Sequence, residues 1–336
     1  MNNSKQYLKI YQELGEESFN KWGYYYPPKN WEDFNSWNHN TYEKFLKDKE
    51  DGVNKTEIYI KLLDTINNFG FYLAFQNIDY ELLNNAIYQS ARHQLLNNAI
   101  IASVHNHPFV LKEILNSFAC NDFDILQNFF PKNLEHSKDL NYSAVTINLM
   151  MVLYYEQTEL RDAALKIADK FLEKKTILWH KYIVMYFKAL INEDAKDASL
   201  CLQELCFAYQ VMEHSVMKLY NKLSKCFSSQ IHGLYRFVRF INKELYKNIT
   251  QPTHFCFDQE FEIWQLKNNY PSGKLFYTYP PELNYMNKVL EAKIPTVTLY
   301  NPYPNKKDLY KNVDKFISEL TENIQINSRT QNQNYR

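Results

Sequence analysis

Two arginines, a histidine and a tyrosine lie close together in the segment HGLYRFVR, residues 232–239. Imidazole transfers protons near neutral pH, and guanidinium binds carboxylate or phosphate through paired hydrogen bonds, so such a group could act in catalysis or in binding. If 230–246 forms a helix, its apolar side chains make one stripe, and Tyr235, Arg236 and Arg239 fall on the other sides. We therefore predict a basic face that binds an acidic or phosphate-bearing partner. The alternative is a solvated surface on which arginines stack on aromatic rings.

No motif of a known catalytic or cofactor site accompanies these residues. The chain has six glycines, and none lies in a G-x-G or G-K-[ST] sequence, which argues against dinucleotide-binding and P-loop folds. The serine motif G-x-S-x-G and the zinc motif H-E-x-x-H are missing as well. We expect no catalytic residues, no cofactor and no enzymatic activity. A helical hydrolase whose residues converge from distant helices remains the competing hypothesis.

The spacing of histidines and cysteines does not favour a metal site. His105 and His107 are two residues apart beside Pro108, and on a helix this spacing points them in different directions. Cys201 and Cys206 are five residues apart on an expected helix, which is neither a zinc nor a redox spacing. We expect no bound metal. The five cysteines contain no C-x-x-C pair and are predicted to be reduced and mostly buried.

The charge of the chain indicates a protein partner. The sequence has 38 basic and 38 acidic residues, whereas nucleic-acid-binding proteins usually have a basic excess, so we expect no nucleic-acid partner. Residues 1–135 hold 12 Lys and Arg against 17 Asp and Glu, and the remainder has the opposite excess. No run of about 18 apolar residues and no leader-like start is present. We therefore expect no membrane association and a cytoplasmic location.

Apolar residues recur at helical spacing along almost the whole chain. One stripe of a single helix is predicted from Ile58, Leu62, Ile66, Phe69 and Leu73. A second helix follows Asp79, which is a candidate cap, and Thr56 is a candidate cap of the first. Further helices are predicted near 109–118, 122–130, 140–157, 159–173, 176–191, 195–212, 214–224 and 230–246. Short polar connectors between them favour antiparallel helical hairpins. Glu193, Asp194 and Asp197 lie in one such connector and are candidate caps of the helix that follows.

One hairpin has the pattern of a tetratricopeptide-type unit. Its first helix has Trp179, Tyr186 and Ala189, and its second has Ala195, Ala198 and Leu202. Because one unit alone matches, the expected fold class is all-α, an irregular array of antiparallel helical hairpins that is tetratricopeptide-like in part. A tetratricopeptide-like adaptor or scaffold that binds a peptide is the alternative function, and it would need at least three stacked repeats.

Composition divides the chain into four segments. They are an N-terminal helical and aromatic/Pro-rich segment (1–54), a helical-hairpin core (55–250), a C-terminal Pro/Tyr-rich segment with a final helix (251–325), and a disordered tail (326–336). Residues 23–40 are expected to form an extended Pro-Pro turn fixed by aromatic packing. Loop and short helix are expected over 270–304, since a lone strand there would have no partner. The final helix is predicted from about Lys307 to Ile324.

Several blocks of sequence together resemble a known family. They are NNAIYQSARHQLLNNAIIAS (84–103), YFKALINEDAKDASLCLQEL (186–205), HGLYRFVR (232–239) and FDQEFEIWQ (257–265). Over roughly residues 55–270, the chain resembles the immunity protein 49 family of bacterial polymorphic toxin systems. The resemblance implies a mostly α-helical cytosolic protein that binds and neutralises one cognate toxin domain. A helical immunity family that protects against nuclease toxins is the alternative relative.

Seven residues are the candidate partner-binding residues: His232, Tyr235, Arg236 and Arg239, with Arg92, Trp31 and Trp37 as further candidates. Arginine, tyrosine and tryptophan are the residues that dominate binding hot spots. We expect a monomer or homodimer that binds at or beside the active site of a toxin acting in the cytosol. If Arg236 and Arg239 are anchors, changing both to Ala should weaken binding by at least about 2 kcal/mol.

Overall fold

The computed structural model describes residues 3–47, 53–63, 66–101, 107–303, 305 and 309–333. Helices dominate this part of the chain, and its strands are the two-residue segments β1 (Leu299–Tyr300) and β2 (Tyr310–Lys311). The prediction of an all-α fold is therefore confirmed. The chain forms two compact units. Unit 1 consists of Met1–Tyr11, His107–Phe123 and Phe130–Ser272, and unit 2 of Gln12–Asn106, Asp124–Phe129 and Gly273–Arg336.

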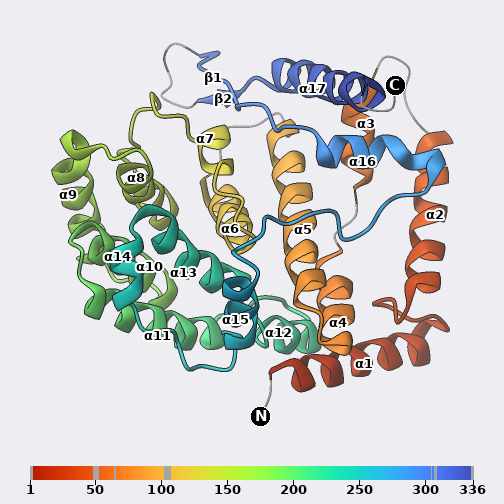
Figure 1. Cartoon of the computed structure of the whole chain (residues 1–336), viewed down its shortest axis with the longest axis horizontal. Helices are drawn as coiled ribbons and strands as arrows, with labels where there is room; N and C mark the ends of the chain where they lie inside the picture. The colour runs from red at the N-terminus through yellow and green to blue at the C-terminus, as the bar shows by residue number, and fades with distance from the viewer. Residues whose placement is uncertain are drawn as a thin grey trace. The chain divides into compact units, whose positions relative to one another are not determined.

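In unit 1, α13 packs against α6, α11 and α14 (Figure 1). The unit contains the start of α1 (Asn3–Trp22), α6 (His107–Phe118), α8 (Tyr142–Tyr154), η1 (Thr158–Leu160), α9 (Arg161–Leu172), α10 (Leu178–Ile191), α11 (Ala195–Val211), α12 (Lys218–Ser224), α13 (Ser229–Ile241), α14 (Lys243–Asn248) and α15 (Gln259–Lys267). Helices α8 with α9 and α10 with α11 form hairpins, and α8 packs on α10. The expected tetratricopeptide-type unit corresponds to the α10–α11 hairpin.

In unit 2, the helices α3, α4, α16 and α17 pack against α5. The elements of this unit are the rest of α1, α2 (Trp31–Lys47), α3 (Lys55–Leu62), α4 (Asn67–Asn77), α5 (Tyr80–Ile100), α7 (Ile125–Phe129), η2 (Pro281–Leu283), α16 (Asn284–Glu291), β1, β2 and α17 (Val313–Gln333). Helix α17 lies across α5 instead of along it (Figure 1). Gln89 on α5 exchanges two hydrogen bonds with the backbone of Tyr277, which attaches the extended segment before η2.

Side-chain caps fix where several helices begin. Asp79 accepts a hydrogen bond from the Leu82 amide at 2.9 Å, and Asp194 accepts one from the Asp197 amide at the same distance. Both caps were expected from the sequence. The expected cap of α3 was wrong, because Asn54 fills that position and accepts a hydrogen bond from the Thr56 amide at 2.8 Å.

Two predicted helices are each divided in the structure. The stripe from Ile58 to Leu73 spans two helices, because Leu63 adopts an extended conformation with ψ 132° and α4 begins at Asn67. The helix predicted over 230–246 breaks at Asn242, which is extended and accepts hydrogen bonds from two amides of α14. In both places the apolar residues keep their helical spacing past the point where the helix ends. The spacing alone therefore cannot reveal where one helix ends and the next begins.

The two Pro- and Tyr-rich regions also differ from expectation. The non-helical turn covers only 23–30, since α2 begins at Trp31. Leu299–Tyr300 is a strand, and the partner that the sequence did not reveal is Tyr310–Lys311, to which it pairs antiparallel. Helix α17 runs on to Gln333, past the predicted end at Ile324 and into the expected tail; 334–336 lie outside the described residues. The four expected segments follow chain order, whereas each unit combines separated stretches.

Candidate functional site

The segment 232–239 forms the centre of α13, and α13 lies against α6 with almost no space between the backbones. A Cβ atom added to Gly233 would lie 1.8 Å from the backbone oxygen of Leu115, so this position requires glycine. Ser228 caps the helix through the Ile231 amide, and its own amide donates to the Cys256 carbonyl at 3.0 Å. The loop before α15 is thereby fixed to the start of α13.

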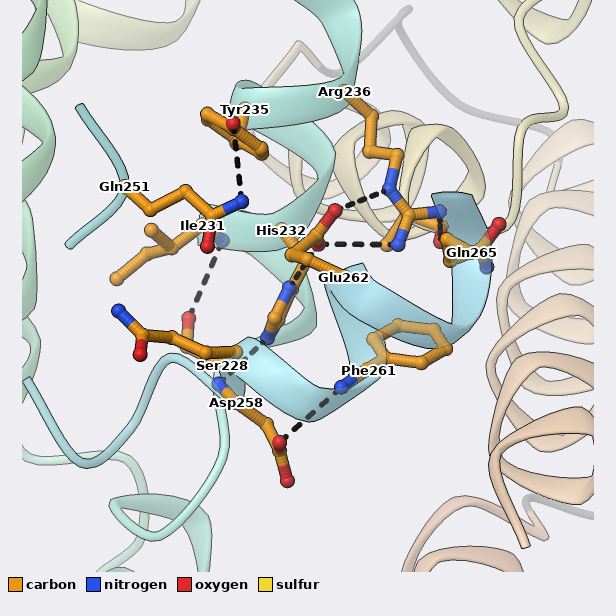
Figure 2. A network of polar contacts seen from close by, with 12 residues as sticks. Ser228, Ile231, His232, Tyr235, Arg236, Gln251, Asp258, Phe261, Glu262 and Gln265 are labelled. Carbon is orange, nitrogen blue, oxygen red and sulfur yellow. Dashed lines mark hydrogen bonds and ion pairs between the residues drawn. The ribbon is translucent and has the colours of Figure 1, made fainter. Parts of the chain in front are cut away.

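This arrangement brings Glu262 of α15 against His232 and Arg236 of α13 (Figure 2). Arg236 donates from Nε to Glu262 Oε2 at 2.9 Å and from Nη2 to Oε1 at 3.1 Å. Its Nη1 donates to the Ala119 carbonyl at 3.1 Å. The guanidinium therefore holds the carboxylate through two hydrogen bonds and has a backbone acceptor for its remaining nitrogen.

The same contacts define the tautomer of His232. The Asp258 amide donates to His232 Nε2 at 3.1 Å, so Nε2 is the unprotonated acceptor. Nδ1 then bears the proton and donates to Glu262 Oε1 at 2.5 Å. The ring stacks on Phe257 with 4.2 Å between ring centroids. His232 is therefore a neutral imidazole that orients the carboxylate and joins it to the N-terminus of α15.

The balance of charges keeps Glu262 ionised although it is buried. Burial by itself raises the pKa of this carboxyl group, because the charged form loses its hydration. The charge of Arg236 and the hydrogen bond from His232 outweigh burial, and the pKa of Glu262 is lowered. The three side chains form a saturated ion network, and their side chains have at most 1% of their surface exposed. We call them the α13–α15 network.

Burial of the network makes the expected basic face wrong. His232 and Arg236 have no exposed surface and Tyr235 has 4%, so these residues cannot contact a partner on the surface of unit 1. The single apolar stripe of this helix suggested that only one side of it is covered. In the structure α6, α11 and α15 cover α13 on several sides. A substrate also has no access to the imidazole or the carboxylate, and the network is therefore a structural element of unit 1.

The other candidate residues have separate environments. Arg239 is half-buried and lies 3.5 Å above the ring of Tyr270, which is the stacked alternative considered for this segment. Arg92 is also buried, so its expected exposure is wrong; it donates from Nη2 to the Ala292 carbonyl at the C-terminal end of α16 in unit 2. A cation is favourable there because helix C-termini have partial negative charge.

The two candidate tryptophans are more than one-third exposed, and both belong to unit 2. Trp31 packs one side of its ring on Phe69 and Tyr277, with centroid distances of 5.0 and 5.4 Å, and so attaches α2 to the unit. Trp37 contacts Tyr24 and Tyr26 instead. Trp31 is thus mainly a packing residue, whereas Trp37 belongs to a group of surface rings.

This group consists of Trp22, Tyr24, Tyr26 and Trp37, and we call it the α1–α2 aromatic cluster. Its neighbouring rings have centroids 5.2 to 6.0 Å apart. Each of the four residues has between 40% and 48% of its surface exposed. Contiguous exposed rings are uncommon on monomeric proteins, because they leave apolar area in water, and where present they often mark an interaction site.

A hollow of about 610 Å³ lies beside the same helix. Its lining includes Glu32, Asn35 and Ser36 of α2, and Tyr277 and Glu282 from the segment around η2. The Tyr277 hydroxyl donates to Asn35 Oδ1 at 2.6 Å, which fixes one wall. Cavities of about 300–1,000 Å³ are typical of small-ligand sites, and the lining of this one includes the carboxylates of Glu32 and Glu282. The sequence did not indicate it, because its walls are some 240 residues apart along the chain.

A metal site was not expected, and the residues considered for one are only partly described. His105 lies outside the described residues, as does the side chain of His107. Within the described part of the chain, no group of three or more His, Cys, Asp or Glu side chains is placed to hold a metal ion. All five cysteines are free and buried. Of the helices in the described ranges, none is both long and apolar enough to span a membrane.

Comparison of the chain with protein-family models, with curated proteins and with solved structures finds no match. The fold and the side-chain geometry therefore define an all-α protein of two units with a structural ion network in one and an exposed aromatic cluster in the other.

Proposed function

We propose that this chain is an immunity-type binding protein, which neutralises a cognate toxin domain in the cytoplasm by covering part of its surface and performs no chemistry itself. The proposal begins from the resemblance of four sequence blocks to the immunity protein 49 family. Such a function needs a rigid scaffold and a complementary surface, and the helical hairpins of unit 1 and the close packing around α5 in unit 2 provide a scaffold of this kind.

The observation on which the proposal mainly rests is the α1–α2 aromatic cluster. Large rings that already contact one another lose little side-chain entropy on binding, and tryptophan and tyrosine are among the commonest hot-spot residues. Trp37, one of the candidate residues from the sequence, lies within this cluster. The proposed binding surface is therefore on α1, α2 and the turn between them, and no longer on α13.

Co-expression tests this function directly. We expect the chain to restore growth of bacteria that express the variable C-terminal domain of a large secreted protein encoded by the neighbouring gene. The double variant Trp22→Ala/Trp37→Ala should lose this protection. Its matched control is Leu200→Ala/Phe207→Ala, which removes two exposed apolar side chains from α11 in unit 1 and should still protect. Absence of protection by the unaltered chain, or equal protection by both double variants, contradicts the proposal.

A further inference from the structure

The hollow beside α2 has walls that the fold of unit 2 fixes. On the side of η2, Gln89 of α5 exchanges two hydrogen bonds with the backbone of Tyr277. Asn287 of α16 accepts a hydrogen bond from the Tyr279 amide at 2.8 Å and donates one to the Tyr279 carbonyl at 2.9 Å. The Tyr277 hydroxyl joins this wall to Asn35 of α2. A molecule that binds in the hollow therefore meets walls whose shape is already set, which lowers the entropy cost of binding.

One buried amide in the lining of the hollow lacks a hydrogen-bond partner. Asn38 has 4% of its surface exposed, and its Nδ2 has no acceptor among the described residues. Asn287 has the same exposed fraction, but the oxygen and the nitrogen of its side-chain amide are both hydrogen-bonded to Tyr279. A buried donor without an acceptor destabilises the folded state. A molecule bound in the hollow can supply the acceptor that Asn38 lacks.

The charged groups in the lining are two carboxylates. Glu32 and Glu282 are exposed, and no ion pair or hydrogen bond joins either side chain to another described residue. Lys, Arg and His are absent from the described residues that line the hollow. A cation in this space is attracted by both carboxylates, whereas an anion is repelled. Tyr42 and Tyr277 also belong to the lining, and the faces of tyrosine rings attract organic cations.

The hollow and the α1–α2 aromatic cluster use different sides of α2. Glu32, Asn35 and Asn38 follow one another at steps of three residues, which makes them neighbours along the helix surface. Trp37 is turned by about 100° from Asn38 around the helix axis, and it does not line the hollow. The chemistry of the hollow can therefore be considered apart from the surface proposed to bind a toxin.

From the unpaired amide and the two carboxylates, we infer that the hollow binds a small organic cation, an ammonium or guanidinium compound that also carries a carbonyl or hydroxyl oxygen. The cationic group pairs with Glu32 and Glu282, and the oxygen accepts a hydrogen bond from Asn38. A cavity of about 610 Å³ has room for such a molecule. The inference goes beyond the proposed function and does not depend on it, because the α1–α2 aromatic cluster is not part of the hollow.

The test uses the full chain and three small probes in calorimetric titrations. N-acetylargininamide has a guanidinium and carbonyl oxygens, and it should bind saturably and more weakly as salt rises. N-acetylcitrullinamide has an uncharged urea in place of the guanidinium, and its Kd should be at least about tenfold higher. n-Butylguanidinium keeps the cation but has no oxygen, so it should also bind more weakly than N-acetylargininamide.

A double variant tests the two carboxylates. Glu32→Gln/Glu282→Gln keeps the shape of both side chains and removes their charge, so it should raise the Kd for N-acetylargininamide at least about tenfold. The matched control is Glu81→Gln/Glu291→Gln, which removes two exposed carboxylates of unit 2 that do not line the hollow. The control should bind as the unaltered chain does. Circular dichroism confirms that each variant is folded.

The variant Asn38→Leu separates a binding role from a structural one. Leucine has nearly the shape of asparagine and no unpaired donor, so the midpoint of thermal unfolding should stay equal or rise. The Kd for N-acetylargininamide should rise at least about tenfold, whereas that for n-butylguanidinium should not change. Asn287→Leu is the matched control; it loses the paired hydrogen bonds to Tyr279 and should lower the midpoint.

Several outcomes would overturn the inference. They are absence of saturable binding of N-acetylargininamide, equal binding of N-acetylcitrullinamide, and equal weakening in the two carboxylate double variants. A loss of thermal stability in Asn38→Leu as large as that in Asn287→Leu would overturn it as well, because Asn38 would then be a structural residue. The co-expression test does not involve the hollow, so a failure of this inference can be distinguished from a failure of the proposed function.

Discussion

Glu262 is a buried carboxylate whose neighbours decide whether it can stay charged. Two hydrogen bonds from Arg236 and one from His232 replace the water that the carboxylate loses. Removing one member of a buried ion network is costly, because the remaining charge has no partner and little hydration. The three residues of the network therefore stabilise the fold together, and loss of any one of them is expected to destabilise it.

The residue-scale prediction concerns Glu262→Gln. Glutamine removes the charge and points an N–H group at donors of Arg236 or His232, so we expect a loss of about 3–5 kcal/mol in the free energy of unfolding. Urea unfolding followed by circular dichroism measures it. The matched control is Glu260→Gln on the exposed side of α15, where losing a favourable charge at the helix N-terminus should cost less than about 1 kcal/mol. Equal effects of the two substitutions would contradict a structural role for the network.

The pH dependence of stability follows from the lowered pKa of Glu262. A carboxyl group whose pKa is lower in the folded than in the unfolded state stabilises the fold fully above the unfolded value, about 4.3, and stops doing so as the pH falls through the folded value. Arg236 and His232 are the groups that face it, and the Asp258 amide donates to the other ring nitrogen of His232. We expect the free energy of unfolding to fall on acidification below about pH 5, and to fall less steeply in Glu262→Gln. Parallel curves for the two proteins would exclude Glu262 as a source of the acid sensitivity.

At the scale of elements, the contact between α13 and α6 depends on one missing side chain. Gly233 allows the α13 backbone to approach the Leu115 carbonyl, and this approach in turn places Arg236 within reach of the Ala119 carbonyl at the end of α6. A glycine inside a helix weakens the helix by itself, by about 1 kcal/mol relative to alanine. The close packing of the two helices offsets that cost.

We predict that Gly233→Ala lowers the free energy of unfolding by about 1–3 kcal/mol, because the added methyl group forces the two helices apart. Thermal unfolding measures the effect. Gly15→Ala on α1 is the matched control, since its Cβ would lie 3.3 Å from the Tyr25 side chain and at an ordinary contact distance of 4.0 Å from the Pro27 carbonyl oxygen. The control gains the same helix propensity with a neighbour that can move, so it should be close to neutral. A neutral Gly233→Ala would mean that α6 and α13 do not pack this closely.

At the scale of the whole molecule, the cysteines report on the packing of one unit. All five lie in unit 1 and are buried. Burial raises the pKa of Cys201 and of Cys226 to about 12, whereas a hydrogen bond with Cys206 lowers the pKa of Cys256. All five thiols are buried, so a reagent cannot reach them while unit 1 is closed. Thiol labelling should therefore follow the opening of unit 1.

We expect none of the five thiols to react with Ellman's reagent within minutes in the native protein, and all five to react in guanidinium chloride. Absorbance of the released product gives the count. Leu200→Cys is the positive control, because it places a thiol next to Cys201 on the exposed side of α11, and it should react at once. Rapid reaction of a native cysteine would show that unit 1 is less closely packed than described.

Local sequence was sufficient for the helical class, most helix positions and the caps at Asp79 and Asp194, because apolar spacing and capping act within a few residues. The tertiary structure alone decided the place of the basic residues on α13. Whether an arginine is solvated or buried depends on a carboxylate 26 positions further along the chain, and no local pattern encodes that distance. Gly233, inside a helical pattern, was a local sign that α13 packs closely on another helix.

The α1–α2 aromatic cluster was likewise predictable from the sequence only in part. Its residues were visible in the sequence as a Tyr-, Trp- and Pro-rich segment, and Trp37 was a candidate from residue type alone. Which rings lie on the surface depends on the partners that the fold provides, as for Trp31 against Phe69 and Tyr277. Helix formation is decided by neighbours in the chain, whereas exposure is decided by neighbours in space. The sequence therefore determined where most of the helices form, and the fold determined which side chains remain exposed and available for binding.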